Sequence, residues 1–369
     1  MLDRCGPGEA LRVSPMLGAV RAAHPSALIT LLVSEQAAPL FLGDRRLDRV
    51  LASHLYGRRG RRLPRLRTLF GAGRIAARLG FRYDLVITFL WGTTVLNAIG
   101  WLAGRKRGIG YPHLLAGLLR TGPDTYPDQG DIAAGLALLE AAGIQPPDAA
   151  NPALVVAQQD RTKAQQLLCS RGRLPQRPLV VMHTGSDWAC QQWLPERWAQ
   201  LSDRIRGEYD ADIVFTGVAG ERSYIQQIQD LMSTSSISIA GDTSLLELAA
   251  VISQADFCVS VDSAAHDMAQ ALSVPAVAIA GPTMPEAPPG RTLRVINRTM
   301  AQNRGTILAC QSHFPLGLCH DYSCPFAGLK GVSVDRVLDA VARSGFLQSA
   351  SKSQAVRSHA LPAALGGTR

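Results

Sequence analysis

The sequence predicts an α/β protein built from two doubly wound domains, each with a parallel central sheet. Three observations predict this class. The chain has 369 residues, more than a single hydrophobic core usually serves, so two domains are expected. In both halves, short apolar runs of strand length alternate with stretches of helix length, the pattern of repeated strand–helix units. A polar, Pro-rich stretch separates the halves, as expected of a linker.

In the first half, apolar residues at helical spacing predict one helix over residues 11–23. The run 27–33 is short, apolar and rich in β-branched residues, so it predicts a buried strand. Further strands are expected at 49–52, 84–90 and 107–110, and further helices at 66–79, 93–102 and 131–142. Gly143 is placed to end the last of these helices.

The domain boundaries follow from composition. We expect a first domain over 1–150, a linker over 151–178 that includes a helix at 161–170, and a second domain over 179–345. Residues 346–369 are rich in Ser, Ala and Gly, so a disordered tail is expected. In the second domain, strands are expected at 179–183, 212–216, 236–240, 257–261 and 276–280. Helices are expected at 194–206, 222–232, 244–253 and 264–272.

The composition, 47% apolar and 18% charged, is that of a globular protein. No apolar run is long and uncharged enough for a membrane helix, and no basic-then-apolar leader follows Met1, so a soluble cytoplasmic protein is expected. The seven cysteines are then expected to be reduced. Three of them, Cys310, Cys319 and Cys324, cluster near two histidines without zinc-finger spacing, so loop packing is favoured over a metal site.

The net charge is +9, and much of the surplus lies in one run. The run consists of Arg58, Arg59, Arg61, Arg62, Arg65 and Arg67. A solvated loop and attraction to anionic lipid or a phosphorylated acceptor both explain it. Nucleic-acid binding is not expected, because no recognised binding motif accompanies the run.

Polar or small residues follow four expected strands of the second domain, where ligands of open parallel sheets bind. They are His183-Thr184-Gly185-Ser186, Thr216-Gly217 with Glu221, Asp262-Ser263-Ala264-Ala265-His266 and Gly281-Pro282-Thr283. Small residues and hydroxyls let backbone N–H groups approach a phosphate, and a carboxylate can accept hydrogen bonds from a ribose. Each group also has a purely structural explanation as a helix cap, a dipole partner or a turn. Their recurrence along one sheet favours a nucleotide site.

Short motifs in both halves occur in a distinctive order. In the first half they are Gly8-Glu9-Ala10-Leu11, Ser14-Pro15-Met16-Leu17, Ala22-Ala23-His24-Pro25 and Ile29-Thr30-Leu31-Leu32-Val33. In the second half they are Trp193-Leu194-Pro195-Glu196-Arg197-Trp198, Ala240-Gly241-Asp242-Thr243-Ser244-Leu245, Glu247-Leu248-Ala249, Asp262-Ser263, Ala269-Gln270-Ala271-Leu272 and Gly281-Pro282-Thr283. In this order they resemble glycosyltransferase family 9, the bacterial heptosyltransferases of lipopolysaccharide assembly, over about residues 2–341.

The resemblance implies a GT-B fold, in which two Rossmann-like domains face each other across a cleft and the second binds the donor. It implies inverting, metal-independent transfer of a heptose from an ADP-sugar to a lipid-linked core oligosaccharide, without a cofactor. Because that acceptor lies in the inner membrane, weak, salt-sensitive contact with the anionic leaflet is expected. Glu9 stands where the family has an Asp that serves as general base.

The same resemblance assigns the donor site. The diphosphate would be held by Thr184, Gly185, Ser186, Ser263 and Thr283, and the ribose by Glu221. Asp262 would contact the sugar or anchor its loop. The remaining donor-binding candidates are Gln191, Thr216, Gly217, Ala264, His266, Gly281 and Pro282.

Three departures from the family pattern matter. Gln191 and Gln192 stand where the family often has a Lys, which would neutralise charge on the donor phosphates. Asp267 occupies the position of a family His, and His266 precedes it. Only residues 2–5 remain for the first strand, so either the natural start lies upstream or a central strand is lost. The first is favoured, since losing that strand would expose an edge of the core.

These departures leave other hypotheses open. A relative that binds a nucleotide-sugar without transferring it is the main alternative. Sugar-nucleotide epimerisation on the same fold is disfavoured, because the chain offers no clear set of catalytic carboxylates and His in both domains. An adaptor that docks on membranes through the basic run is the fourth hypothesis.

Overall fold

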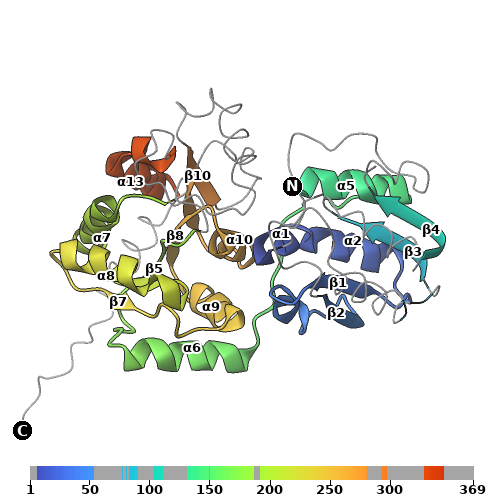
Figure 1. Cartoon of the computed structure of the whole chain (residues 1–369), viewed down its shortest axis with the longest axis horizontal. Helices are drawn as coiled ribbons and strands as arrows, with labels where there is room; N and C mark the ends of the chain where they lie inside the picture. Colours follow the sequence, from blue (N-terminus) through green and yellow to red (C-terminus); the bar gives the residue numbers. More distant parts are fainter. Residues whose placement is uncertain are drawn as a thin grey trace, which may run out of the picture.

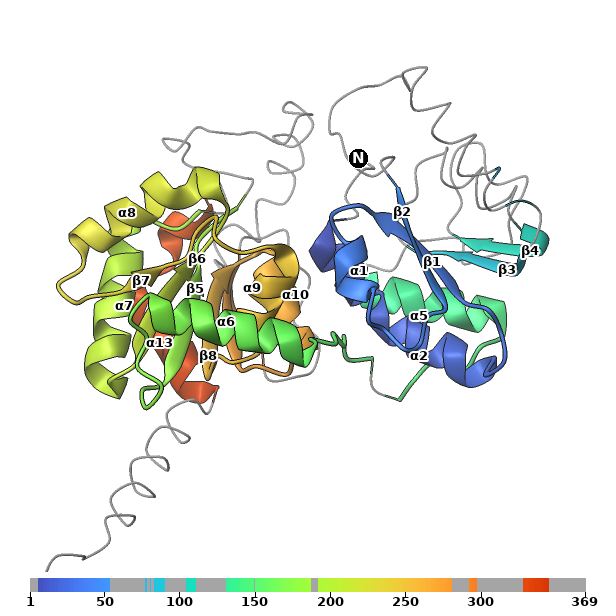
Figure 2. The same ribbon diagram turned by 90° about the horizontal axis from the view of Figure 1, so that it is seen from below.

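The computed structural model describes residues 6–53, 77, 80, 83–89, 104–110, 131–148, 150–186, 192–280, 292–296 and 328–344. These residues form two units that lie side by side, the first within 6–148 and the second within 150–344 (Figures 1 and 2). Both are α/β, as the alternating pattern of the sequence predicts.

The second unit is built on a six-stranded sheet in the order β10-β9-β8-β5-β6-β7. Its paired neighbours are all parallel. The strands are β5 (Leu179–His183), β6 (Asp212–Thr216), β7 (Ile237–Ser238), β8 (Phe257–Val261), β9 (Ala276–Ala280) and β10 (Thr292–Ile296). From β5 the chain winds outward through β6 and β7, then returns to β8 on the other side of β5. This is the doubly wound order expected of repeated βα units.

Helices cover both faces of this sheet, because successive side chains of a strand point to opposite faces. Val181 and Val214 face one core, and their neighbours Val180 and Phe215 face the other. The first core includes α6 (Gln158–Ser170), α9 (Leu245–Ile252) and α10 (Ala264–Ala271). The second core includes α7 (Pro195–Tyr209), α8 (Arg222–Leu231), η5 (Gly328–Gly331) and α13 (Val334–Arg343). Helix α6, which falls in the stretch expected as linker, packs against α9.

The first unit contains two parallel strand pairs, β1-β2 and β3-β4. Its elements are α1 (Pro7–Arg12), α2 (Ser14–Ala23), β1 (Thr30–Ser34), η1 (Ala38–Phe41), β2 (Arg49–Ser53), β3 (Tyr83–Thr88), β4 (Gly104–Gly110) and α5 (Asp131–Ala142). Met16 of α2 packs with Leu138, Leu139 and Ile109 in a core of its own. A Cβ on Gly135 of α5 would overlap Met16, so the small residue permits this close helix contact. The expected first strand falls on residues 1–5, outside the described part.

One expectation for this unit was wrong. Residues 11–23 do not form a single helix, because α1 ends at Arg12 and α2 begins at Ser14. Pro15 has no backbone N–H to donate to the preceding turn, and its ring favours the first turn of a new helix. The short strand β7 covers less than the expected 236–240, and β10 and α13 were not anticipated. The helices expected at 66–79 and 93–102 lie almost wholly outside the described residues.

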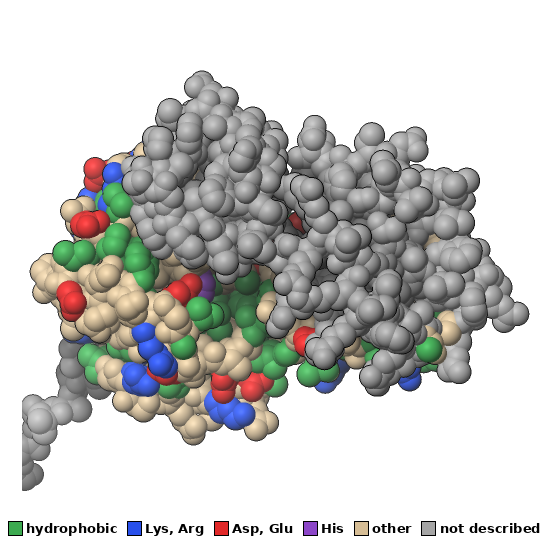
Figure 3. Space-filling model, in the orientation of Figure 1, with side chains coloured by type: hydrophobic (Ala, Val, Ile, Leu, Met, Phe, Trp, Pro, Cys, Tyr) green, Lys and Arg blue, Asp and Glu red, His purple; other side chains and the backbone are tan. Residues whose placement is uncertain are grey.

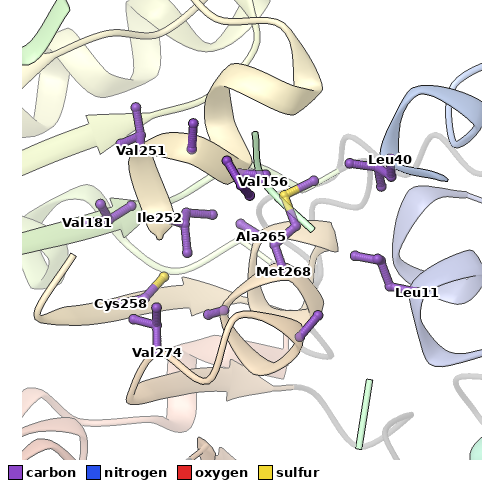
Figure 4. Close-up of a cluster of buried hydrophobic side chains, with 14 of the residues drawn as sticks. Leu11, Leu40, Val156, Val181, Val251, Ile252, Cys258, Ala265, Met268 and Val274 are labelled. Carbon is purple, nitrogen blue, oxygen red and sulfur yellow. The ribbon is translucent and has the colours of Figure 1, made fainter. Parts of the chain in front are cut away.

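A continuous apolar cluster joins the two units. Leu11 of α1 and Leu40 of η1 come from the first unit, and Ala265 and Met268 of α10 from the second; all belong to one buried cluster (Figure 4). Helix α1 contacts α10, and η1 contacts α9. Since burial of apolar surface stabilises by about 25 cal/mol per Å², this cluster favours the arrangement in which α1 lies on α10.

The described surface carries charges of both signs. In Figure 3, acidic and basic side chains lie next to one another on the second unit, as where Arg171 and Arg222 both bind Asp242. The arginine run 58–67 lies outside the described residues. None of the helices in the described part of the chain has the length and hydropathy required to cross a bilayer.

Candidate functional site

The carboxyl ends of β5 and β8 flank the point where the winding of the second sheet reverses. These strands are direct neighbours, with His183 opposite Ser260. Thr184-Gly185-Ser186 follow β5, and Asp262-Ser263 follow β8. In open α/β sheets, ligands bind in the crevice at such a reversal. Two of the four predicted groups therefore lie at the position where the topology places a ligand site.

The Glu221 carboxylate lies against the backbone that follows β5 and β6. Glu221 ends the short helix η4 (Ala219–Glu221), and its Oε2 accepts a 2.8 Å hydrogen bond from the backbone N–H of Val218. A Cβ on Gly185 or on Gly217 would lie closer than 3.0 Å to this carboxylate. The structure thus brings Gly185, Gly217 and Glu221 together, although they are widely spaced in the sequence. Because neither glycine has a side chain, the Glu221 carboxylate can occupy the space between them.

The side chains of His183 and Thr216 meet between the ends of β5 and β6. His183 Nδ1 lies 2.9 Å from Thr216 Oγ1. Burial lowers the pKa of His183 to about 4, so the imidazole is neutral at physiological pH. Thr184 is also buried, and its Oγ1 has no hydrogen-bond partner among the described residues. Because a buried hydroxyl normally has a partner, this one is a candidate for contact with a bound group.

Ser263 precedes α10 at the N-cap position without capping the helix through its side chain. Its backbone is extended, as at an N-cap, yet its side chain makes no capping hydrogen bond. The Oγ is buried and has no partner in the described part of the chain. The purely structural explanation of Ser263 as a helix cap is therefore not what the structure shows. A helix N-terminus carrying a free hydroxyl is suited to an anion.

The other candidates of the second unit are placed as follows. Ala264 and His266 lie in the first turn of α10, and His266 is buried. Ser186 is partly exposed, and its carbonyl accepts a 3.3 Å hydrogen bond from Gln192 Nε2. Gln191, Gly281, Pro282 and Thr283 lie outside the described residues, as do Cys310, Cys319 and Cys324. Among the described residues, no group of three or more His, Cys, Asp or Glu side chains could hold a metal ion.

Glu9 lies on α1, which packs on α10. A Cβ on Gly8 would lie 3.4 Å from Ala264 Cα and would overlap the Asp267 carboxylate, so glycine permits the close approach of the two helices. Burial raises the pKa of Glu9, Arg12 lowers it, and Asp267 and Asp131 raise it. The net effect is a raised pKa, the direction expected of a carboxylate that accepts a proton. The carboxylate turns back toward Gly6, where an added Cβ would lie 2.7 Å from Oε2.

Arg12, which links the two units, was not among the residues predicted from the sequence. Its guanidinium binds Asp267 of α10 through two hydrogen bonds and Asp131 of α5 through a third. The three-residue spacing from Glu9 places Arg12 on the same side of α1, a signal that the sequence did contain. Its partners 119 and 255 residues away carry no local signal.

One family model matches more than half of the chain, and several solved structures share its fold. The family model described as glycosyltransferase family 9 (heptosyltransferase) matches residues 103–313. Matching solved structures include a family 9 glycosyl transferase from Veillonella parvula DSM 2008, with 19% identity, a TM-score of 0.76, and coverage of 94% of this chain and 96% of that one. No curated protein matches significantly.

Two structures from E. coli show the same fold. ADP-heptose LPS heptosyltransferase II has 18% identity and a TM-score of 0.65, over 93% of this chain and 97% of that one. Heptosyltransferase WaaC, solved with ADP-2-deoxy-2-fluoro heptose, has 16% identity and a TM-score of 0.62, over 92% and 96%. The expected GT-B fold is therefore confirmed. Because the family model covers more than half of its length, the chain belongs to glycosyltransferase family 9, the heptosyltransferases.

Proposed function

We propose that this protein is an inverting glycosyltransferase that moves a heptose, or a related sugar, from an ADP-sugar to a lipopolysaccharide core acceptor. The observation that carries the proposal is the cluster of Gly185, Gly217 and Glu221 at the carboxyl edge of the second sheet. This cluster lies within the segment that matches the family. Related structures were solved with ADP and with an ADP-heptose analogue, which supports an ADP-sugar as the donor.

In this proposal the donor lies across the ends of β5, β6 and β8. Glu221 accepts hydrogen bonds from the ribose hydroxyls. Thr184, Gly185, Ser186 and Ser263 donate to the diphosphate, with the N-terminus of α10 contributing its dipole. Gly281, Pro282 and Thr283, which match the family motif, and Gln191, which stands near the family's usual Lys, complete the proposed site; all four lie outside the described residues. The proposed transfer is metal-independent, with backbone and hydroxyl donors stabilising the charge that develops on the leaving ADP.

Glu9 is the proposed general base. Its carboxylate takes the proton from the acceptor hydroxyl while that oxygen bonds to the anomeric carbon of the donor sugar. The bond between the anomeric carbon and the diphosphate oxygen breaks, and its electron pair leaves with ADP. Attack from the face opposite the diphosphate inverts the configuration. The raised pKa of Glu9 makes it a stronger base than a solvent-exposed glutamate.

The test is a transfer assay with ADP-heptose and heptose-deficient lipopolysaccharide, with and without a chelator. We expect Glu9→Gln to lower kcat about 10²–10⁴-fold, the usual contribution of a general base, with ADP affinity retained. Glu9→Asp keeps the carboxylate and is expected to retain part of the rate. Glu140→Gln, an exposed carboxylate on α5, is the matched control. Full activity of Glu9→Gln would exclude the role of base.

A second function is carried by a specific observation. The Glu9 carboxylate turns back toward Gly6 and interacts with its own backbone N–H. A carboxylate in this position also stabilises the N-terminus of a helix, a role that involves no catalysis. A protein that binds the nucleotide-sugar without transfer would bind ADP-heptose in calorimetry and show no turnover. Association with the membrane that holds the acceptor is tested by sedimentation with anionic liposomes across a salt series, where binding is expected to weaken as salt rises.

A further inference from the structure

Arg12 is the one side chain in the described structure that forms ion pairs with carboxylates of both units at once. Its Nε lies 2.9 Å from Asp267 Oδ1 and its second terminal nitrogen 3.1 Å from Oδ2. Its first terminal nitrogen lies 3.0 Å from Asp131 Oδ2. The planar guanidinium suits such two-pronged binding, which a lysine cannot reproduce. We call Arg12, Asp267 and Asp131 the Arg12 bridge.

The bridge is sheltered from water. The Asp267 side chain is only 2% exposed, and those of Arg12 and Asp131 are 24% and 22% exposed. Water and salt therefore screen the Arg12–Asp267 pair much less than a surface pair. Asp267 and nearby acidic groups raise the pKa of Arg12 well above its usual value despite burial. Removing one member of the pair would leave a buried charge without its partner. The free-energy cost of that unpaired charge exceeds the net contribution of the intact pair to stability.

The bridge is coupled to Glu9 by geometry. Glu9 and Arg12 are three residues apart on α1, and Asp267 lies one turn into α10, the helix that Ser263 precedes. Gly8 of α1 and Asp267 of α10 are tightly packed, because a Cβ on Gly8 would overlap the Asp267 carboxylate. A shift of Arg12 relative to Asp267 would therefore move Glu9 relative to the start of α10.

We propose that Arg12 and Asp267 are positioning residues, which hold α1 on α10 so that Glu9 faces the sugar of the bound donor. This inference rests on the proposed function, in which Glu9 is the base. The charged groups that act on Glu9 come from all three helices of the contact: Arg12 from α1, Asp267 from α10 and Asp131 from α5. Burial has the largest effect on the pKa of Glu9, and the three charges of the bridge act on it as well.

The experiment compares Arg12→Lys, Arg12→Gln and Asp267→Asn in the full chain. Positional errors of about 1 Å can cost on the order of 10²-fold in rate, so each variant is expected to lower kcat about 10–100-fold, with ADP affinity within about threefold of wild type. Arg12→Gln removes a group that lowers the pKa of Glu9, so the acid limb of the kcat/KM profile moves to higher pH. Arg12→Lys loses the two-pronged binding, so kcat is expected to fall. Because the positive charge is kept, the acid limb of its kcat/KM profile is expected to stay in place.

A readout independent of turnover is carbon-13 NMR of glutamate carboxyl groups. The Glu9 signal is assigned by its loss in Glu9→Gln, and its titration is expected to move upward in Arg12→Gln and downward in Asp267→Asn. Arg204→Gln, which breaks the exposed pair between α7 and α13, is the matched control and leaves kcat and titration unchanged. Should Arg12→Gln fail to fold, kcat and the Glu9 titration of Arg12→Lys and Asp267→Asn still test the positioning role.

The outcomes separate this inference from the proposed function. Wild-type kcat in all three variants, with an unchanged Glu9 titration in Arg12→Gln and Asp267→Asn, would overturn the positioning role, while loss of rate in Glu9→Gln would leave the function intact. Full rate in Glu9→Gln would instead exclude Glu9 as the base, and absence of transfer by the wild-type protein would overturn the proposed function. If the wild-type protein binds ADP-heptose without transfer, an unchanged Glu9 titration overturns coupling through the bridge, and a shifted one supports it.

Discussion

Gly185→Ala is the sharpest test of the donor site, because the space beside this residue cannot hold a methyl group. The added Cβ would lie closer than 3.0 Å to Glu221, so the carboxylate must leave its position. It would then lose the 2.8 Å hydrogen bond from the Val218 N–H, a net loss of about 1 kcal/mol in unfolding free energy. Displacing it from the proposed ribose contacts removes at least one hydrogen bond to a charged group, which contributes about 1.5–3 kcal/mol.

The expected result is that the Kd for ADP rises roughly 10–150-fold, since about 1.4 kcal/mol corresponds to a factor of ten. Isothermal titration calorimetry measures the Kd, and urea denaturation measures the stability. Gly220→Ala is the control, because a Cβ there meets nothing within 4 Å. In a Glu221→Ala background, Gly185→Ala should cost little more, since the obstructing carboxylate is gone. Wild-type ADP affinity of Gly185→Ala, or additive losses in the double variant, would show that Glu221 does not contact the ribose from its present position.

Two further predictions concern pH and the contact between the units. Because the folded pKa of His183, about 4, lies below the usual 6.5, the unfolded chain binds the proton more tightly between these values. The unfolding free energy should therefore fall by about 3 kcal/mol as the pH drops from 6.5 to 4; this loss should be absent from His183→Gln in denaturation curves across pH. Gly8→Ala would overlap Asp267 and should lower the melting temperature and the transfer rate, whereas Gly18→Ala, which meets nothing within 4 Å, should do neither.

The strands of the second unit were predictable because each is short, apolar and followed by small or polar residues. Leu179–His183, Asp212–Thr216, Phe257–Val261 and Ala276–Ala280 are found at the expected positions. Buried parallel strands need apolar side chains on both faces, so each leaves a continuous local signal. The helix break at Val13 was missed because apolar periodicity continues across it, and only the backbone of Pro15 interrupts the hydrogen bonds.

The site was partly predictable for a related reason. Groups at strand ends can be assigned to one edge of a sheet once the strands are known, so Gly185, Gly217 and Glu221 could be named in advance. Their mutual contact could not, because strand order is set by packing between distant segments. The lack of a capping bond at Ser263 likewise depends on a side-chain rotamer that the surroundings select.

The α/β class, the strands of the second sheet and the polar groups that end them could be predicted from the amino-acid sequence, since each depends on neighbours along the chain. That Arg12 joins Asp131 and Asp267, and that α1 lies on α10, became visible in the folded structure. Those contacts connect residues more than a hundred positions apart. A buried charge is stable only where the fold supplies its partner, and no local pattern in the sequence specifies which residue that partner is.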